Sequence, residues 1–137
     1  QHTLDYKNRT SIPQKFRIAL NAGAVLTLGL DNCLFLYSKT EWQKLSERMK
    51  DLPLTGSDAR AFSRYLFGGA NETTFDSLGR IKIPDYLKTH AGLEKKIIIL
   101  GVVNRIEIWS ERNWHIFNKK ITKTSSEIAE KLSGSGI

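Results

Sequence analysis

The sequence predicts an α+β fold in which two repeated halves, each with small mixed sheets, share one barrel-like core. The phrase "LDYKNRTSIP" at residues 4–13 recurs as "FDSLGRIKIP" at residues 75–84, at a constant offset of 71. A second stretch, "LTLGLDNCLFLYSKTEWQKL" at residues 26–45, aligns with "IILGVVNRIEIWSERNWHIF" at residues 98–117 at an offset of 72. Repetition at a fixed spacing indicates a duplication. Because a half of about 70 residues buries too little apolar surface to be stable by itself, we expect the halves to pack on each other.

Each half is expected to begin with a short strand, a tight turn and a second short strand. Asn8 and Gly79 occupy the same place in the two turns, and both residue types tolerate a left-handed backbone. Pro13 and Pro84 cannot donate a hydrogen bond to a continuing strand, and proline suits the first turn of a helix. The expected second strands are "RTSI" and "RIKI", and the expected helices are "PQKFRIAL" and "PDYLKTHAGL", the latter closed by Gly92.

Two more strands and a helix are expected to complete each half. The strands are "AVLTLGL" and "CLFLY" in the first half and "KKIIILG" and "RIEIW" in the second, where "RIEIW" alternates like a half-exposed strand. Thr40, followed by Gln43, resembles a capping box. Helical spacing then predicts an apolar stripe in each half, interpreted as core and not as a platform for stacking bases: Trp42, Leu45, Met49 and Leu52 in the first, and Trp114, Phe117 and Ile121 in the second.

The repeats also suggest how the chain is divided. We expect a first repeat at residues 1–55, a linking helix and loop at residues 56–71, and a second repeat at residues 72–137. The second repeat would include a C-terminal helix that extends through Leu132. All three parts are expected to form one fused structural domain.

Composition narrows the class of function. The net charge is +7 and the isoelectric point is about 9.6, which makes nucleic acid or another anionic partner a reasonable expectation. The single cysteine, Cys33, excludes an intrachain disulfide, fits a reducing compartment and is interpreted as a small buried residue. The apolar runs are far shorter than the ~20 residues of a membrane helix, so no membrane association is expected.

The sequence shows no pattern that is typical of an enzyme. It contains no glycine-rich phosphate loop of the Walker type, no nucleophile with a local catalytic signature, and no two histidines at metal-ligand spacing. We therefore expect no catalytic residue, no metal, no cofactor and no small-molecule substrate.

The repeated Asp-x-x-x-Arg pattern is the candidate site. As an exposed ion pair across a hairpin it would contribute only ~0–1 kcal/mol to stability. Alternatively, the aspartate orients the arginine toward a phosphate or a guanine edge. Basic neighbours favour the second interpretation in the first half, although Asp76 and Asp85 dilute the cluster of Arg80, Lys82 and Lys88 in the second. The candidates, on two basic hairpin tips, are Arg9, Arg80, Lys7, Lys15, Arg17 and Lys82 for DNA binding and Asp5 and Asp76 for orientation.

These phrases, together with "LPLTGSDARAFSRYLF" and "EWQKL", resemble the MraZ family of bacterial regulators, encoded at the head of the division and cell-wall gene cluster. The resemblance covers Thr3 to Phe117, and the paired motifs carry over as Asp5 with Arg9 and Asp76 with Arg80. It implies a duplicated swapped-hairpin (double-split) β-barrel of two AbrB-like halves with short helices packed around it.

The resemblance also implies a function. It predicts a cytoplasmic, nucleoid-associated transcriptional regulator that binds direct repeats in double-stranded DNA upstream of its own operon. It further predicts a homo-oligomer, commonly a ring of eight subunits. Recognition of backbone charge does not by itself distinguish DNA from RNA, so an RNA-binding protein remains an alternative. A protein scaffold or antitoxin-like module with an acidic partner is the other.

Overall fold

The strands of the computed structural model, which describes residues 1–135, form one six-stranded and one two-stranded sheet. The larger sheet has the order β1-β7-β8-β4-β3-β5, and the smaller one pairs β2 with β6. The bounds are β1 (His2–Thr3), β2 (Arg9–Ser11), β3 (Ala24–Leu28), β4 (Leu34–Ser38), β5 (Asn71–Thr73), β6 (Arg80–Lys82), β7 (Lys96–Val102) and β8 (Arg105–Ser110). The α+β class and the two repeated halves are confirmed.

The sheets differ from the prediction in two respects. Every strand pairing is antiparallel, so the expectation of mixed sheets is wrong. Within residues 1–135 the strands do not close into a barrel, because β1 and β5 are the two open edges of the larger sheet. The second repeat was predicted to reach residue 137, and residues 136–137 lie outside the described residues.

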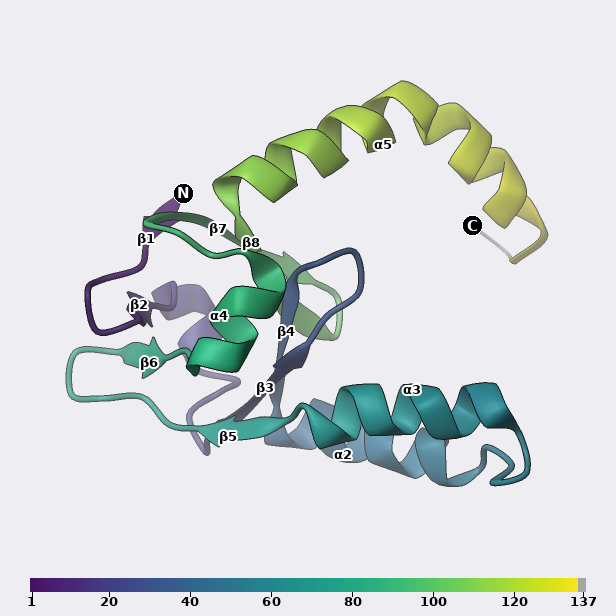
Figure 1. Ribbon diagram of the computed structural model, residues 1–137, viewed down its shortest axis with the longest axis horizontal. Coiled ribbons are helices and arrows are strands. Elements are labelled where there is room, and N and C mark those ends of the chain that lie inside the picture. Colours follow the sequence, from purple (N-terminus) through teal and green to yellow (C-terminus); the bar gives the residue numbers. More distant parts are fainter. Residues whose placement is uncertain (136–137) are drawn as a thin grey trace.

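The halves exchange strands with each other. β1 of the first half pairs with β7 of the second, and β5 of the second half pairs with β3 of the first. β2 pairs with β6 and β4 with β8, so these pairings also join the halves (Figure 1). Thr10 lies opposite Ile81, and Phe35 lies opposite Glu107; in each pair the two residues occupy equivalent places in the repeats. The chain is therefore arranged about an approximate two-fold axis.

Both faces of the larger sheet are buried, which explains the nearly continuous apolar runs of its central strands. Leu34 and Leu36 of β4 pack in a cluster with Ile106 and Ile108 of β8, together with Ile81 of β6 and residues of α1 and α4. The alternate residues of the same strands, Phe35, Tyr37 and Trp109, pack against α2, α3 and α5. From the predicted stripes, Trp42, Trp114 and Phe117 lie in this second cluster and are confirmed as core, whereas Leu52 is 41% exposed and is not part of it.

Five α-helices surround the sheets within the described residues, at α1 (Gln14–Arg17), α2 (Lys39–Lys50), α3 (Ser57–Gly68), α4 (Asp85–Ala91) and α5 (Glu111–Leu132), and a short 3₁₀ turn follows at Ser133–Ser135. Ser38 caps α2 by accepting a hydrogen bond from the backbone N–H of Glu41 at 3.1 Å. Thr40 is therefore not the cap that the sequence suggested, because the helix already begins at Lys39. Gly92 ends α4 in a left-handed conformation with φ 61°, as predicted.

The strand "RIEIW" does not have the predicted exposed face. Glu107 is only 8% exposed, and it accepts hydrogen bonds from Arg105 Nε at 3.0 Å and from Trp109 Nε1 at 3.1 Å. The charge is buried because these partners satisfy the carboxylate, so polar spacing in the sequence did not indicate exposure here.

The two ends of the molecule differ in shape. The loops that lead into β2 and β6 lie at one end, whereas α5 and the α2–α3 pair extend from the other end and diverge (Figure 1). None of the helices in residues 1–135 has the length and apolar character needed to span a membrane. Across the same residues, no three His, Cys, Asp or Glu side chains gather closely enough to hold a metal ion.

Cys33 supplies a test of this core. Its thiol is fully buried, Sγ lies 3.1 Å from the carbonyl oxygen of Leu30, and burial raises the pKa of the thiol to about 12. We expect the native protein to resist a thiol reagent at neutral pH, because the thiolate is the reactive form. One equivalent should react after denaturation, since the chain has one cysteine. Rapid stoichiometric labelling of the native protein would contradict this packing.

Candidate nucleic-acid interface

The first Asp-x-x-x-Arg phrase forms a tight turn closed by its own aspartate. Asp5 Oδ1 accepts hydrogen bonds from the backbone N–H groups of Lys7 and Arg9, both at 2.9 Å. Asp5 Oδ2 accepts a further hydrogen bond from Arg9 Nε at 2.8 Å. One carboxylate thus fixes the turn and also holds the guanidinium. Asn8 adopts φ 60°, the left-handed conformation expected at this place.

The second phrase repeats this geometry. Asp76 Oδ1 accepts from the backbone N–H groups of Leu78 and Arg80, both at 2.9 Å, and Asp76 Oδ2 accepts from Arg80 Nε at 2.8 Å. Gly79 takes the place of Asn8, with φ 75°. The orienting contact expected between each aspartate and its arginine is therefore present in both halves.

The two phrases form a single surface, because β2 and β6 pair with each other. Arg9 lies opposite Lys82 and Ser11 lies opposite Arg80, whereas the alternate residues Thr10 and Ile81 face the core and are each 1% exposed. We call the outer face of β2 and β6, with the turns 5–8 and 76–79, the basic ribbon. The two turns lie at opposite ends of this ribbon, because each turn precedes its own strand and the two strands run antiparallel.

The aspartates keep the arginines of the basic ribbon in place at neutral pH. Partial desolvation raises the pKa of Asp5, but hydrogen bonds from the N–H groups of Arg9 and Lys7 outweigh it, and the net pKa is lowered. The backbone hydrogen bond from Arg80 is the largest influence on Asp76, whose pKa is also lowered. Arg80 Nη1 additionally lies 3.7 Å from Asp5 Oδ2, so the two phrases are linked electrostatically.

The structure separates the predicted lysines. Lys82 is exposed on the ribbon opposite Arg9, and Lys7 is exposed in the first turn, with Nζ 5.7 Å from the centre of the Tyr6 ring. Lys15 lies elsewhere: it lines a cavity of about 590 Å³ beside the β7–β8 turn and packs over the Phe16 ring. The geometry therefore brings Lys7 and Lys82 to the ribbon and leaves Lys15 apart from it.

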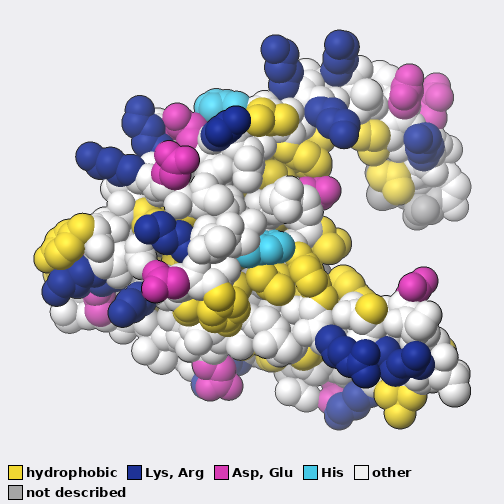
Figure 2. All heavy atoms as spheres, viewed as in Figure 1, with side chains coloured by type: hydrophobic (Ala, Val, Ile, Leu, Met, Phe, Trp, Pro, Cys, Tyr) yellow, Lys and Arg dark blue, Asp and Glu magenta, His cyan; other side chains and the backbone are white. Residues whose placement is uncertain are grey.

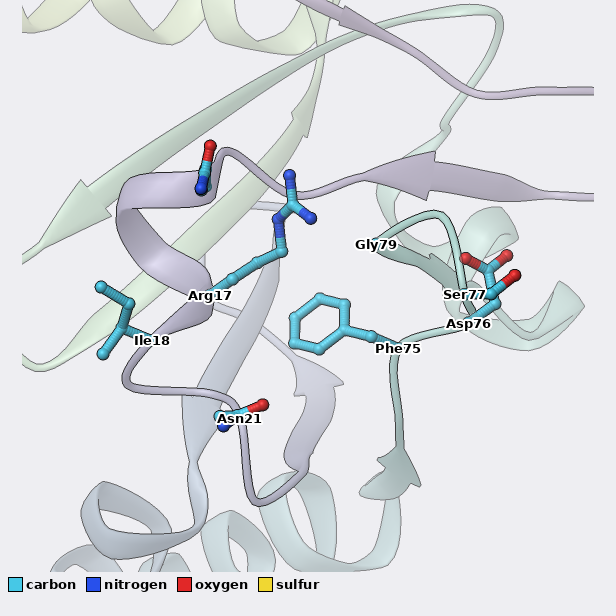
Figure 3. Close-up of a pocket in the computed structure, with 8 residues that line it drawn as sticks. Arg17, Ile18, Asn21, Phe75, Asp76, Ser77 and Gly79 are labelled. Atoms are coloured by element: carbon cyan, nitrogen blue, oxygen red, sulfur yellow. The ribbon is translucent and has the colours of Figure 1, made fainter.

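Arg17 lies against the turn of the other half. Its Nε donates to the carbonyl oxygen of Ile12 at 2.9 Å, and the guanidinium lies directly on Gly79. Figure 3 shows the side chain extending from α1 toward the loop of Gly79, beside Phe75, in a pocket of about 390 Å³. The sequence had grouped Arg17 with Arg9 because the two are close along the chain.

Lys88 holds the corresponding place at the first turn, and it was missing from the predicted site. Its Nζ donates to Asn8 Oδ1 at 3.0 Å, while Asn8 Nδ2 donates to Asp85 Oδ1 at 2.9 Å. The repeat itself could have identified it, because the offset of 71 places Lys88 on Arg17.

The comparisons with known proteins agree over the whole chain. The sequence model of the family described as "MraZ protein, putative antitoxin-like" matches residues 1–65 and again residues 66–134. The chain is 51% identical over 136 residues to the "Transcriptional regulator MraZ" of Alkaliphilus oremlandii, covering 99% of this chain and 95% of that protein. It is 49% identical over 137 residues to the protein of that name from Caldanaerobacter subterraneus subsp. tengcongensis, covering 100% and 96% of the two chains. The Limosilactobacillus reuteri protein of that name is 50% identical over 132 residues, with 96% and 93% covered.

The lowered pKa values of Asp5 and Asp76 predict acid-dependent stability. A carboxyl group whose folded pKa lies below its ordinary value of 3.8 stabilises the fold above that value, and this contribution is lost as the pH falls through the folded pKa. We expect the double variant Asp5→Asn/Asp76→Asn to lose less stability than the wild type between neutral pH and about pH 3, measured by urea unfolding. Glu94→Gln, at an exposed loop position, is the control. Equal losses in all three proteins would contradict the role of the turns.

Proposed function

The chain belongs to the MraZ family, and we propose that it is a transcriptional regulator that binds double-stranded DNA through its basic ribbon. The observation that carries this proposal is the pair of arginines, Arg9 and Arg80, each held by an aspartate on the outer face of a two-stranded ribbon. The relatives are named as transcriptional regulators, and the chain aligns with them along nearly its whole length.

The geometry suits the reading of bases. The DNA major groove is wide enough to admit a two-stranded β-ribbon. Each aspartate engages the Nε of its arginine, so the far edge of the guanidinium can form a bidentate contact with a guanine. Each arginine side chain is 25% exposed, which is enough to reach a ligand from a fixed position. Because the guanidinium is already ordered, less rotamer freedom is lost on binding.

The family resemblance supplies finer expectations. We infer that the DNA sites are short direct repeats upstream of the protein's own operon, and that the protein acts in the cytoplasm on the nucleoid. The strand exchange supports a swapped-hairpin relationship between two AbrB-like halves. The division at residues 1–55, 56–71 and 72–137 also stays a prediction.

Direct repeats require more than one ribbon in fixed register, so we propose a closed homo-oligomer, in the family pattern a ring of eight. The surface for it lies at the end opposite the ribbon. Trp114 and Phe117 attach α5 to the body, and the same face of the helix continues through Ile121, Ile128 and Leu132, of which the last two are 39% and 42% exposed. Apolar side chains line the hollow between α5 and α3 (Figure 2).

The occupant of this hollow is proposed to be α5 of a second copy. The distal half of α5 carries the acidic residues Glu127 and Glu130, whereas α3 carries Arg60 and Arg64 and exposes Phe62. Both surfaces contain apolar groups, and the two glutamates can pair with the two arginines, although Lys131 and Asp58 lie beside them. Because the contact joins two different patches, it either closes into a ring or grows into a filament.

The first prediction for this function compares the ribbon with a distant charge. Arg9→Ala and Arg80→Ala should each weaken binding to the gene's own upstream duplex by about 1–3 kcal/mol per base contact and reduce discrimination against a scrambled duplex. Lys50→Ala, on α2 with a side chain that is 68% exposed, should bind like the wild type. The measurement is fluorescence titration, with circular dichroism as the check of folding. If folded Arg9→Ala binds like Lys50→Ala, the ribbon is a structural hairpin only.

The second prediction concerns assembly. Ile128→Glu places a charge in the apolar face of α5 and should reduce the molar mass measured by light scattering. Ile116→Glu is the matched control, because Ile116 lies on the opposite face of the same helix and is 61% exposed. An unchanged mass in Ile128→Glu, or a monomeric wild type at micromolar concentration, would refute the proposed interface.

A further inference from the structure

Each turn of the basic ribbon is accompanied by a cation that belongs to the other half of the chain. Arg17 of α1, in the first half, lies on Gly79 in the second turn (Figure 3). Lys88 of α4, in the second half, donates to Asn8 in the first turn. Both cations occupy the same place in the repeat, so the arrangement follows the approximate two-fold axis.

The exchange is a consequence of how the strands pair. The backbone N–H of Ile12 donates to the carbonyl oxygen of Gly79 at 3.3 Å, and that of Ile83 donates to the carbonyl oxygen of Asn8 at 2.8 Å. The end of each ribbon strand is therefore bonded to the turn of the opposite half. The helix that follows each strand begins beside that turn, and a cation of that helix reaches it.

The two turn residues match their cations. Gly79 has no Cβ, and a Cβ at this position would lie 2.1 Å from Arg17 Nη1. Glycine suits this position because φ 75° is left-handed and because a Cβ would displace the guanidinium from its present place. At the first turn, Asn8 provides a side-chain oxygen 3.0 Å from the ammonium group of Lys88. Lys88 is therefore hydrogen-bonded to the turn that it approaches, whereas Arg17 packs on its turn while it is hydrogen-bonded to Ile12.

Within the described part of the chain, neither Arg17 nor Lys88 forms a direct ion pair. Both are partly buried and hydrogen-bonded, so they are ordered. Arg9 and Arg80, by contrast, are paired with aspartates. Ordered cations without acidic partners, at the two ends of a ribbon, are placed to meet the phosphates that flank a groove.

We propose that Arg17 and Lys88 contact DNA phosphates at the two ends of the basic ribbon, each completing the turn of the opposite half. This inference rests on the proposed DNA-binding function and deepens it. Arg9 and Arg80 contact base edges in the middle of the ribbon, and the exchanged cations fix its position on the backbone. Neither repeat by itself contains a complete contact surface.

The first experiment uses the full chain with Arg17→Gln and Lys88→Gln, the charge-keeping variants Arg17→Lys and Lys88→Arg, and Lys50→Gln as control. A phosphate contact carries no sequence information, so each Gln variant should weaken binding to the upstream duplex and to a scrambled duplex by the same factor. The slope of log K against log salt should become shallower by about 0.9 for each phosphate that the variant no longer neutralises. The charge-keeping variants should retain the wild-type slope.

The second experiment tests the exchange through double-mutant cycles in operator affinity. Lys88→Gln combined with Asn8→Ala, and Arg17→Gln combined with Gly79→Ala, should be non-additive, because each pair is in contact across the halves. The crossed pairs, Lys88→Gln with Gly79→Ala and Arg17→Gln with Asn8→Ala, should be additive. Coupling within the crossed pairs alone would overturn the exchange.

The outcomes separate this inference from the function on which it rests. If the folded wild type does not prefer the upstream duplex over a scrambled one, the proposed function fails. If the wild type does prefer it, and both Gln variants keep the affinity and salt slope of Lys50→Gln, the function stands and the exchanged contacts are refuted. A weakening that the charge-keeping variants share equally shows a structural role, and it also overturns the proposal.

Discussion

The pairing of β2 with β6 is the contact on which the rest of the site depends. Each strand has three residues, and an isolated two-stranded ribbon of this length is at best marginally stable in water. The ribbon persists because its inner face is part of the core: Thr10 and Ile81 are buried, and Ile12 and Ile83, which follow them, are completely inaccessible. With the inner face anchored in this way, the outer face is free to carry charge. The same pairing brings both aspartate–arginine turns onto one surface and sets each following helix beside the opposite turn.

A duplicated chain can let its halves diverge while it keeps the shared axis, and this protein has done so. Where β4 meets β8, Phe35 lies opposite its own counterpart Glu107, and Arg105 covers the Phe35 ring at 4.5 Å while it binds the Glu107 carboxylate. A like pair at this place would juxtapose two carboxylates or two bulky rings on the axis. The helices diverge as well: α2 has 12 residues and turns back into α3, whereas α5 has 22 residues and extends away from the body (Figure 1).

The sequence predicted the features that depend on local residue type and on the repeat. It did not predict the features that depend on which distant residues come into contact. The class, the strands, the tight turns and the left-handed residues follow from spacing and residue type, as Gly92 and Asn8 illustrate. Repetition shows that the halves are alike, but not which strand pairs with which. The exchange was therefore invisible, and Arg17 was assigned to the nearer turn. Asp76 and Asp85 were expected to dilute the second basic cluster, but Asp85 accepts a hydrogen bond from Asn8 of the other half. The exposure predicted for the strand of Glu107 was wrong for a similar reason, because the burial of this carboxylate depends on hydrogen bonds from Arg105 and Trp109.

The positions of the two proposed surfaces bear on how one small ribbon could select a DNA site. A ribbon of two three-residue strands with two turns can read only a short stretch of bases, and a few contacts of this kind discriminate weakly by themselves. The apolar face of α5 lies at the end opposite the ribbon loops, so the proposed assembly and DNA binding would not compete for the same residues (Figure 1). Copies joined through that end would carry their ribbons outward at fixed separations. Each further ribbon then binds as an intramolecular event at high effective concentration, which converts weak single contacts into selection for repeats of matching spacing. In such an assembly, the pairing of strands between the halves would hold each ribbon in place on its own subunit, and so would keep that spacing constant.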